Sequence, residues 1–562
     1  MSGWSLEDRR NALAKAERDG VDLLVIGGGI SGAGVLRDAA SRGLRAFLVE
    51  RDDFACGTSS RSSKMVHGGL RYIGEGQLAL TREACRERDL LLRQNPNLVR
   101  PLPFLFPAYE GSKHPLWQVH AVLWAYAALA NFRRTARFRM LSVDEVAEFS
   151  HDLRLDGLRG AGLYCDAQVD DARLVLETLK SARSLGADCA NHAEAIEFLR
   201  REDGRLCGLR VRDTLGGGSF VIRAHAIVNA AGPSVERLRG LDRPVAHPEL
   251  RPAKGVHLVL RRNRIHLAGA ITFEAAGRRQ VFLEPWDEDV AILGTTDSFS
   301  PEIDEPTVSI EDVHYLLAAA NEAFPAKGLT TNDLVSVFAG VRPLVDDGTA
   351  DKPPSSVSRE HRIYEDPSGL VSIAGGKLTT YRAMGEALVE RAIRLSPKLR
   401  EARIARSRTL EIPLRDDCFD RAELEAELRG RYHMAPKRIE HLVRSYGAAA
   451  ERMLAEAAEP MRRPIGRTHF TWAEIPFSFR TECPANLCDL LERRMRMALF
   501  AAGQGLPELD QIARVAAEAA GWDAARTRQE AAAYAAAVRR RYQIVAPAMA
   551  VPATRALRAS AA

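Results

Sequence analysis

A glycine-rich turn near the start of the chain constrains the fold more than any other feature. Residues 22–50, DLLVIGGGISGAGVLRDAASRGLRAFLVE, read as an apolar run, a glycine cluster, a helical segment and a second apolar run. This order predicts a β-α-β unit whose Gly27, Gly29 and Gly32 form a G-x-G-x-x-G turn. Gly27 permits a tight turn, Gly29 lets the backbone approach a pyrophosphate, and Gly32 lets helix and sheet pack closely. We therefore predict a Rossmann-type dinucleotide-binding domain.

The residues beside this turn predict how a dinucleotide is held. Ile30 and Ser31 begin the expected helix, whose free N–H groups and positive end favour a phosphate. Glu50 ends the second strand about twenty residues on and can accept hydrogen bonds from a ribose. Because no Arg or Lys replaces this acid, a 2′-phosphate would be repelled, which disfavours NADP. The turn alone does not separate NAD from FAD.

A dense polar loop follows the acidic residue. Residues 57–72, GTSSRSSKMVHGGLRY, combine hydroxyls, small glycines and basic side chains. Flexible serine-rich linkers rarely carry such bulky and charged residues, so we interpret the loop as a second contact zone for phosphate and flavin. The candidate cofactor contacts in it are Thr58, Ser59, Ser60, Lys64, His67, Gly68 and Gly69.

Later segments predict the rest of the architecture. The chain has 562 residues, 46% hydrophobic and 27% charged, which is ordinary globular usage with enough apolar residues for a large core. The runs AIVNAAG (226–232) and LVSIAGG (370–376) read as further strands of the nucleotide sheet. Alternating residues in 256–265 and 279–297 predict an antiparallel sheet, and helical spacing after 396 predicts a helical tail. The two runs and the helix start after them add Gly232, Gly376, Leu378 and Thr379 as candidate cofactor contacts.

We thus expect an α/β fold with a Rossmann-type domain, an antiparallel-sheet (α+β) substrate domain and a C-terminal α-helical domain. The nucleotide-binding domain is expected in three segments, 20–95, 161–235 and 336–396. A substrate- or membrane-facing segment is expected at 96–160. The substrate domain is expected at 236–335 and the helical domain at 400–545. For the helical domain we hypothesise either a subunit contact, as in a homodimer, or a lid.

One apolar stretch raises the question of a membrane surface. Residues 116–132 are too short and too polar to span a bilayer, but they carry Trp117, Trp124 and Tyr126 and are followed by a basic run at 133–139. Two interpretations stay open: a helix lying in the membrane surface, or a buried core helix followed by a solvated basic turn.

The composition of the chain and the absence of certain motifs argue against several classes of protein. The net charge of +5 is too small to argue for a nucleic-acid surface. No two of the eight cysteines form a C-x-x-C pair, so we expect neither a metal site nor disulfides. The scattered cysteines also favour a location in contact with the reducing cytosol. The chain has no H-E-x-x-H and no G-x-S-x-G, which argues against metalloprotease and hydrolase chemistry.

Several motifs in one consistent order carry a family resemblance. They are VIGGGISGAG, TSSRSSKMVHGGLRYI, VDDARLVL (169–176), KGVH (254–257), GTTD (294–297), GVRPL (340–344) and GGKLTTYR (375–382). Over about residues 20–396 the chain resembles the FAD-dependent glycerol-3-phosphate dehydrogenases, and CDLLERRMRMA (488–498) extends the likeness more weakly. The resemblance implies oxidation of sn-glycerol 3-phosphate to dihydroxyacetone phosphate, with electrons passing through FAD to a membrane quinone. It implies peripheral attachment to the cytoplasmic face of a bacterial inner membrane, or a cytoplasmic protein.

This reaction needs cations for a phosphate and a base for a hydroxyl. Four basic residues and a tyrosine lie in the shared motifs or close to them, and their side chains can donate hydrogen bonds to a phosphate. They are Arg71, Arg342, Arg359, Lys377 and Tyr72. His257 has the chemistry of a base at neutral pH, although a contact to substrate or flavin fits it equally.

Three further residues are candidates for the same hydroxyl. Arg342, Thr295 and Asp297 are expected to orient it, with Arg342 in a catalytic position. Three alternatives stay open: an oxidase that passes electrons to oxygen, an NAD-linked dehydrogenase, and a binding protein without activity.

Overall fold

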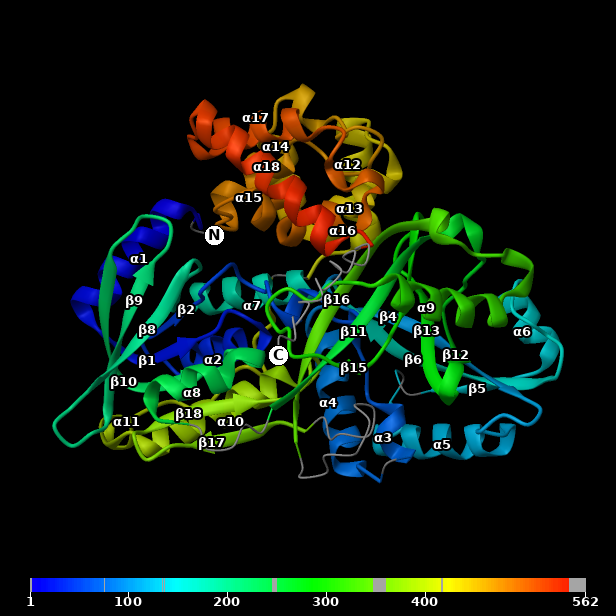
Figure 1. The fold of residues 1–562 in the computed structure, drawn as a ribbon, viewed down its shortest axis with the longest axis horizontal. Coiled ribbons are helices and arrows are strands. Elements are labelled where there is room, and N and C mark those ends of the chain that lie inside the picture. The colour runs from blue at the N-terminus through cyan, green and yellow to red at the C-terminus, as the bar shows by residue number, and fades with distance from the viewer. Residues whose placement is uncertain are drawn as a thin grey trace, which may run out of the picture.

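Two β-sheets stand side by side, and helices of the C-terminal region sit across their junction (Figure 1). The computed structural model describes residues 3–544 except 75, 134, 136, 245–249, 347–359 and 416–417. The expected three-part fold is confirmed. The role of the helical tail as a subunit contact or a lid stays a prediction.

The first sheet holds the glycine turn. Its strands run in the order β17-β18-β10-β1-β2-β7, all neighbours parallel except β17 and β18. Both apolar runs expected to join this sheet do so, because β10 pairs with β1 and with β18. The strands are β1 Val21–Ile26, β2 Ala46–Val49, β7 Asp188–Ala190, β8 Ala193–Arg200, β9 Leu206–Asp213, β10 Ser219–Asn229, β17 Arg362–Glu365 and β18 Leu370–Ala374.

Helices cover both faces of this sheet, and its central strands β1 and β2 are almost wholly apolar. One apolar core joins β1 and β2 to α2, α7 and α10, and a second joins them to α1 and α8. The helices are α1 Leu6–Asp19, α2 Ile30–Ser41, α7 Asp171–Ser184, α8 Val235–Asp242, α10 Tyr381–Leu395 and α11 Pro397–Glu401.

The second sheet is almost wholly antiparallel. It has the order β15-β11-β14-β13-β12-β4-β6-β3, with β16 on β11 and β5 on β6, and only β12 and β4 are parallel. Its strands are β3 Met65–Val66, β4 Arg100–Tyr109, β5 Arg139–Leu141, β6 Leu158–Gln168, β11 Leu250–Arg261, β12 Ala270–Ala275, β13 Arg279–Pro285, β14 Val290–Gly294, β15 Ser298–Phe299 and β16 Leu334–Val345. The helices in this half are α3 Leu70–Gly74, α4 Leu78–Gln94, α5 Leu116–Leu129, α6 Val143–Phe149 and α9 Ile310–Ala323.

Two of the expected domain boundaries fall inside strands of this sheet. The boundary at 161 cuts β6, which pairs with β4 along its length, and the boundary at 336 cuts β16, which pairs with β11. These ladder hydrogen bonds keep both strands with the substrate sheet. The other boundaries stay predictions.

The C-terminal helices pack on the second sheet through one apolar core. Val259, Trp286 and Phe338 of the sheet share this core with Leu490 and Met497 of the helical domain. Its elements are α12 Arg421–Tyr432, α13 Pro436–Tyr446, α14 Ala449–Glu456, α15 Glu474–Thr481, a π-helical turn Asp489–Arg494, α16 Met497–Phe500, α17 Leu509–Ala520 and α18 Ala524–Arg541.

Candidate active site

A cleft of about 1360 Å³, open to solvent, runs along the carboxyl ends of β1, β2, β10 and β18. This edge is where ligands bind in open parallel sheets. Ten of the predicted cofactor contacts line it, namely Gly27, Gly29, Ile30, Ser31, Glu50, Thr58, Ser59, Gly232, Gly376 and Leu378. The structure therefore brings together residues from four distant parts of the sequence.

The glycine turn has no room for side chains. A Cβ on Gly32 would lie 1.9 Å from the carbonyl oxygen of Gly27, and a Cβ on Gly27 would lie 2.6 Å from that of Ala230. Gly27 also has φ +109°, which suits glycine best. The roles predicted for both glycines, a tight turn and close helix packing, agree with these contacts. Gly32 acts from behind the cleft rather than in its wall.

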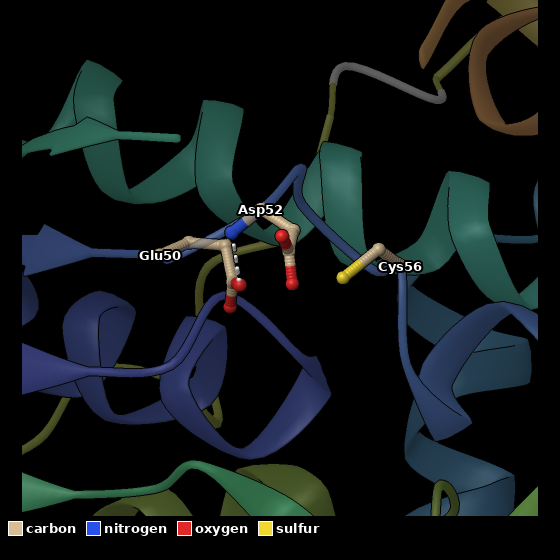
Figure 2. Close-up of side chains that lie close together, drawn as sticks. All are labelled: Glu50, Asp52 and Cys56. Carbon is tan, nitrogen blue, oxygen red and sulfur yellow. Dashed lines mark hydrogen bonds between the residues drawn. The ribbon is translucent and has the colours of Figure 1, made fainter. Parts of the chain in front are cut away.

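Glu50 is held by the turn that it faces. One of its carboxylate oxygens accepts the N–H of Gly28 at 2.5 Å and the other accepts the N–H of Asp52 at 2.9 Å. Figure 2 shows the Glu50 and Asp52 carboxylates pointing the same way, with Cys56 close by. Although this group brings three possible metal-ligand atoms together, both oxygens of Glu50 already accept backbone N–H groups, and its contact with a ribose stays a prediction. Burial raises the pKa of Glu50.

The polar loop bridges the two sheets. Ser59 Oγ accepts the N–H of Ile30 at 2.9 Å, on the side of the glycine turn. Thr58 donates its hydroxyl to the carbonyl of Val341 in β16 at 2.6 Å. The loop is therefore part of the cleft and of the boundary between the two sheets.

Lys64 has a different place from the one expected. Its side chain is fully buried, and Nζ lies 2.9 Å from Asp171 and 3.2 Å from the carbonyl oxygen of Ser60. Burial, opposed by the Asp171 carboxylate, lowers its pKa to about 8. The structure thus puts Lys64 behind the loop as a support and not in the lined cleft, and Ser60 shares that place. The sequence could not show this because the partner Asp171 lies in a distant motif.

The remaining predicted loop residues pack beneath the cleft. Gly68 donates its N–H to Asp166 at 3.0 Å, and a Cβ on it would lie 2.1 Å from the hydroxyl of Tyr126 in α5. The carbonyl of His67 accepts the hydroxyl of Thr379 at 3.3 Å. Gly69 has φ +81° and packs under the ring of Tyr72.

Predicted substrate contacts form two groups beside the cleft, and each group contains basic side chains or a single arginine. In the first, the Lys377 ammonium lies 3.7 Å from the centre of the Tyr72 ring, and the Arg71 guanidinium lies 5.6 Å from the same ring. Lys377 itself lines the cleft. The predicted phosphate contacts Arg71, Tyr72 and Lys377 therefore form one group, whereas Arg359 lies outside the described residues.

In the second group, Arg342 connects two residues of the GTTD motif. Its guanidinium donates to Asp297 and to the hydroxyl of Thr295, both at 3.1 Å. Gly255 leaves it space, since a Cβ there would lie 2.4 Å from the guanidinium. Pro343, the next residue, lines the cleft. The expected association of Arg342, Thr295 and Asp297 is present.

His257 lies within β11, close enough to Arg342 for the two charges to interact. It is 2% exposed, stacks on Phe338 at 4.7 Å between ring centres, and its Nε2 lies 2.8 Å from the hydroxyl of Ser63. Its Nδ1 has no hydrogen-bond partner among the described residues. Burial, together with Arg342 and Lys64, holds the pKa of His257 well below its usual value, which favours the neutral form of the imidazole.

Ser63 is a functional candidate that the sequence reasoning missed. Ser63 stands among several serines of the loop, and no local pattern distinguishes it from them. Only the approach of β11 to the loop reveals its contact with His257.

Known proteins with similar sequences give the family. A family model described as FAD dependent oxidoreductase matches residues 22–391, and one described as the C-terminal domain of alpha-glycerophosphate oxidase matches residues 407–527. The aerobic glycerol-3-phosphate dehydrogenase of Staphylococcus haemolyticus is 34% identical over 492 residues, which cover 85% of this chain and 87% of that one. The chain belongs to the FAD-dependent glycerol-3-phosphate dehydrogenase family. The Staphylococcus aureus protein of the same name is 38% identical over 385 residues, or 68% of each chain.

A solved structure of a glycerol-3-phosphate dehydrogenase agrees with this assignment. The Bacillus halodurans protein, described as complexed with FAD, has a TM-score of 0.78 at 29% identity and covers 95% of this chain and 98% of its own. As a member of this flavoprotein family, the chain uses FAD, and the NAD-linked alternative left open by the glycine turn is set aside. The tight glycine cradle and the Glu50 carboxylate in the cleft wall suit that cofactor.

Proposed function

We propose that this glycerol-3-phosphate dehydrogenase homologue oxidises the secondary alcohol of sn-glycerol 3-phosphate to the ketone of dihydroxyacetone phosphate. The observation that carries the proposal is a single cleft that joins the glycine turn to Lys377 and to Pro343 beside Arg342. Relatives at 34% and 38% identity bear the name of this activity, which supports the same substrate here.

The basic residues are proposed to bind the substrate phosphate. Lys377 lines the cleft and shares the Tyr72 ring with Arg71, and Arg342 precedes Pro343 in the cleft wall, so a phosphate monoester would meet several charge-assisted donors. Asp297 holds Arg342 in place and limits its rotation. Thr295 would orient the substrate hydroxyl from the same strand end.

His257 is proposed to take the hydroxyl proton. The ring is neutral, and stacking on Phe338 together with the Ser63 contact fixes its plane. Bound FAD supplies the acceptor for the hydride that leaves the substrate carbon. The glycine turn and the N-terminus of α2 would hold the diphosphate, Glu50 the ribose, and the segment Gly376–Leu378 the ring end of the cofactor.

We further propose that electrons leave to a quinone at a membrane surface. On α5, Trp117 and Trp124 are 73% and 58% exposed, and they lie seven residues apart on one side of the helix. Arg133 and Arg139 follow with exposed side chains. None of the helices that the structure describes is long and apolar enough to cross a bilayer, so the proposed attachment is in the interface.

An oxidase is the second candidate, because residues 407–527 match a domain described from alpha-glycerophosphate oxidase. Stopped-flow reoxidation of the substrate-reduced protein separates the two functions. If the protein is a dehydrogenase, a soluble quinone analogue should reoxidise the reduced flavin quickly, and air should reoxidise it slowly with little peroxide. Fast reoxidation by air with one peroxide per substrate would establish the oxidase instead.

A further inference from the structure

Asp171, at the start of α7, ties together three segments of the chain. Its side chain is fully buried. One carboxylate oxygen accepts the backbone N–H of Ser62 at 3.0 Å and the Ser62 hydroxyl at 2.8 Å. The other accepts Lys64 Nζ at 2.9 Å and a guanidinium nitrogen of Arg496 at 3.0 Å. Ser62 and Lys64 belong to the polar loop of the active site, whereas Arg496 belongs to the C-terminal helical domain.

Arg496 reaches the loop directly as well. It donates to the carbonyl oxygen of Ser60 at 3.1 Å and, within its own domain, to that of Glu492 at 3.0 Å. It lies between the π-helical turn and α16 with φ +68°, and Lys64 has φ +54°. Left-handed backbone is uncommon for such residues and persists where surrounding contacts fix it. Both residues direct their side chains to the same carboxylate.

Ser63 is the residue enclosed by these contacts. Its neighbours Ser62 and Lys64 are both anchored on Asp171, and its hydroxyl lies 2.8 Å from Nε2 of His257. A shift of the 60–64 turn would therefore move the hydroxyl that fixes the imidazole. Reacting groups need placement to a fraction of an ångström, and a displacement of about 1 Å costs on the order of a hundredfold in rate.

We propose that Arg496 is a positioning residue, through which the C-terminal domain holds the 60–64 turn and with it the Ser63–His257 hydrogen bond. The inference rests on the proposed role of His257. It gives the helical domain a part in the reaction beyond the subunit contact or lid expected from the sequence. Arg496 does not line the cleft, so its effect passes through Asp171 and Ser60.

A matched residue separates positioning from simple attachment of the domain. Arg173 of α7 is also buried and also bridges to the C-terminal domain, where it pairs with Glu482 and donates to the carbonyl oxygen of Arg494 at 2.8 Å. No hydrogen bond or ion pair described for it involves residues 60–64. Loss of Arg173 weakens the same domain contact but leaves the anchors of the turn in place.

The experiment compares Arg496→Gln, Arg496→Lys and Arg173→Gln in the FAD-loaded full-length protein. Anaerobic stopped flow with glycerol 3-phosphate gives the rate and the substrate dependence of flavin reduction, and hydrogen–deuterium exchange follows the peptide spanning 57–66. For Arg496→Gln we expect reduction to slow about 10- to 100-fold at unchanged KM, with faster exchange in that peptide. Arg496→Lys keeps a positive charge beside the Asp171 carboxylate and should recover most of the rate. Arg173→Gln should change neither the rate of flavin reduction nor the exchange of the 57–66 peptide by more than about twofold.

Each contrary result has a distinct meaning. Equal slowing in Arg173→Gln and Arg496→Gln would overturn the inference, because loosening of the domain would then explain both. So would normal reduction in Arg496→Gln while His257→Asn is strongly impaired. If His257→Asn itself reduces normally, the role proposed for His257 fails, and the link drawn from Arg496 to catalysis fails with it. Should Arg496→Gln not fold, the Lys variant and the exchange data decide by the same criteria.

Discussion

The ammonium group of Lys377 lies 3.7 Å above the ring of Tyr72, and the same lysine lines the cleft that begins at the glycine turn. A ring face attracts a cation by about 0.5–2 kcal/mol, so Tyr72 fixes the lysine without neutralising it. This contact joins the end of β18 to α3 and places the proposed phosphate site next to the proposed cofactor site.

Replacement of this lysine tests the phosphate site. Lys377→Met should raise the KM for glycerol 3-phosphate about 10- to 100-fold, because a hydrogen bond to a charged group contributes about 1.5–3 kcal/mol. Steady-state turnover with a quinone analogue, at a series of glycerol 3-phosphate concentrations, measures the KM. Lys398→Met, at an exposed lysine in α11, is the control and should be unaffected. An unchanged KM in Lys377→Met would remove this residue from the site.

The low pKa of His257 makes a prediction about pH. Burial first, and then Arg342 and Lys64, hold that pKa well below the usual 6.5, and the neutral form needed to accept a proton is present above it. The rate of flavin reduction at saturating glycerol 3-phosphate should therefore stay level as pH falls through 6.5 and decline only at more acidic values. The rate at saturation is the quantity to measure, because kcat/KM also follows the second ionisation of the substrate phosphate at about pH 6. His257→Asn should slow flavin reduction about 100-fold or more, while His314→Asn on α9 should not. A loss of activity centred at 6.5 would contradict this assignment.

Glu284 makes a prediction about stability. This carboxyl on β13 is fully buried, neither oxygen has a hydrogen-bond partner among the described residues, and burial raises its pKa to about 8 from the ordinary 4.5. The folded protein thus binds a proton more tightly than the unfolded chain. This contribution to stability is complete below pH 4.5 and is lost as pH rises through 8.

Glu284→Gln removes that loss. The unfolding free energy of the variant relative to that of the native protein should rise by a few kcal/mol as pH increases from 4.5 to 8. Above pH 8 the difference should stay constant. Urea unfolding across this range measures it, and Glu302→Gln, at an exposed position, should show no such trend. A difference that is flat in pH would mean that Glu284 ionises normally in the folded protein.

The exposed tryptophans of α5 predict attachment to lipid. Trp117→Ser combined with Trp124→Ser should abolish most co-sedimentation with anionic vesicles, since aromatic side chains anchor at the headgroup level. The rate of flavin reduction by glycerol 3-phosphate should not change, because α5 lies outside the cleft. Leu215→Ser, at another exposed apolar residue, serves as the control. Retention of vesicle binding in the double variant would place the attachment elsewhere.

The parts of the fold that depend on local pattern were predictable from the sequence. The turn around Gly27 and the strands at 226–232 and 370–376 follow from apolar runs and glycines that are neighbours in sequence. Contacts between distant segments were not predictable. Lys64 was expected at the cofactor, but its partner Asp171 makes it a buried support.

The boundaries inside β6 and β16 and the contact of Ser63 with His257 were missed for the same reason. Each depends on which strand or loop lies opposite in the fold, and no spacing within the segment records that choice.

Whether glycerol 3-phosphate reduces the bound flavin is decided by anaerobic titration of the FAD-loaded protein. We expect the yellow flavin absorbance to bleach, one equivalent of dihydroxyacetone phosphate to form for each flavin reduced, and glycerol without the phosphate to have little effect. A flavin that stays oxidised in excess glycerol 3-phosphate, or that glycerol reduces equally well, would contradict the proposed function.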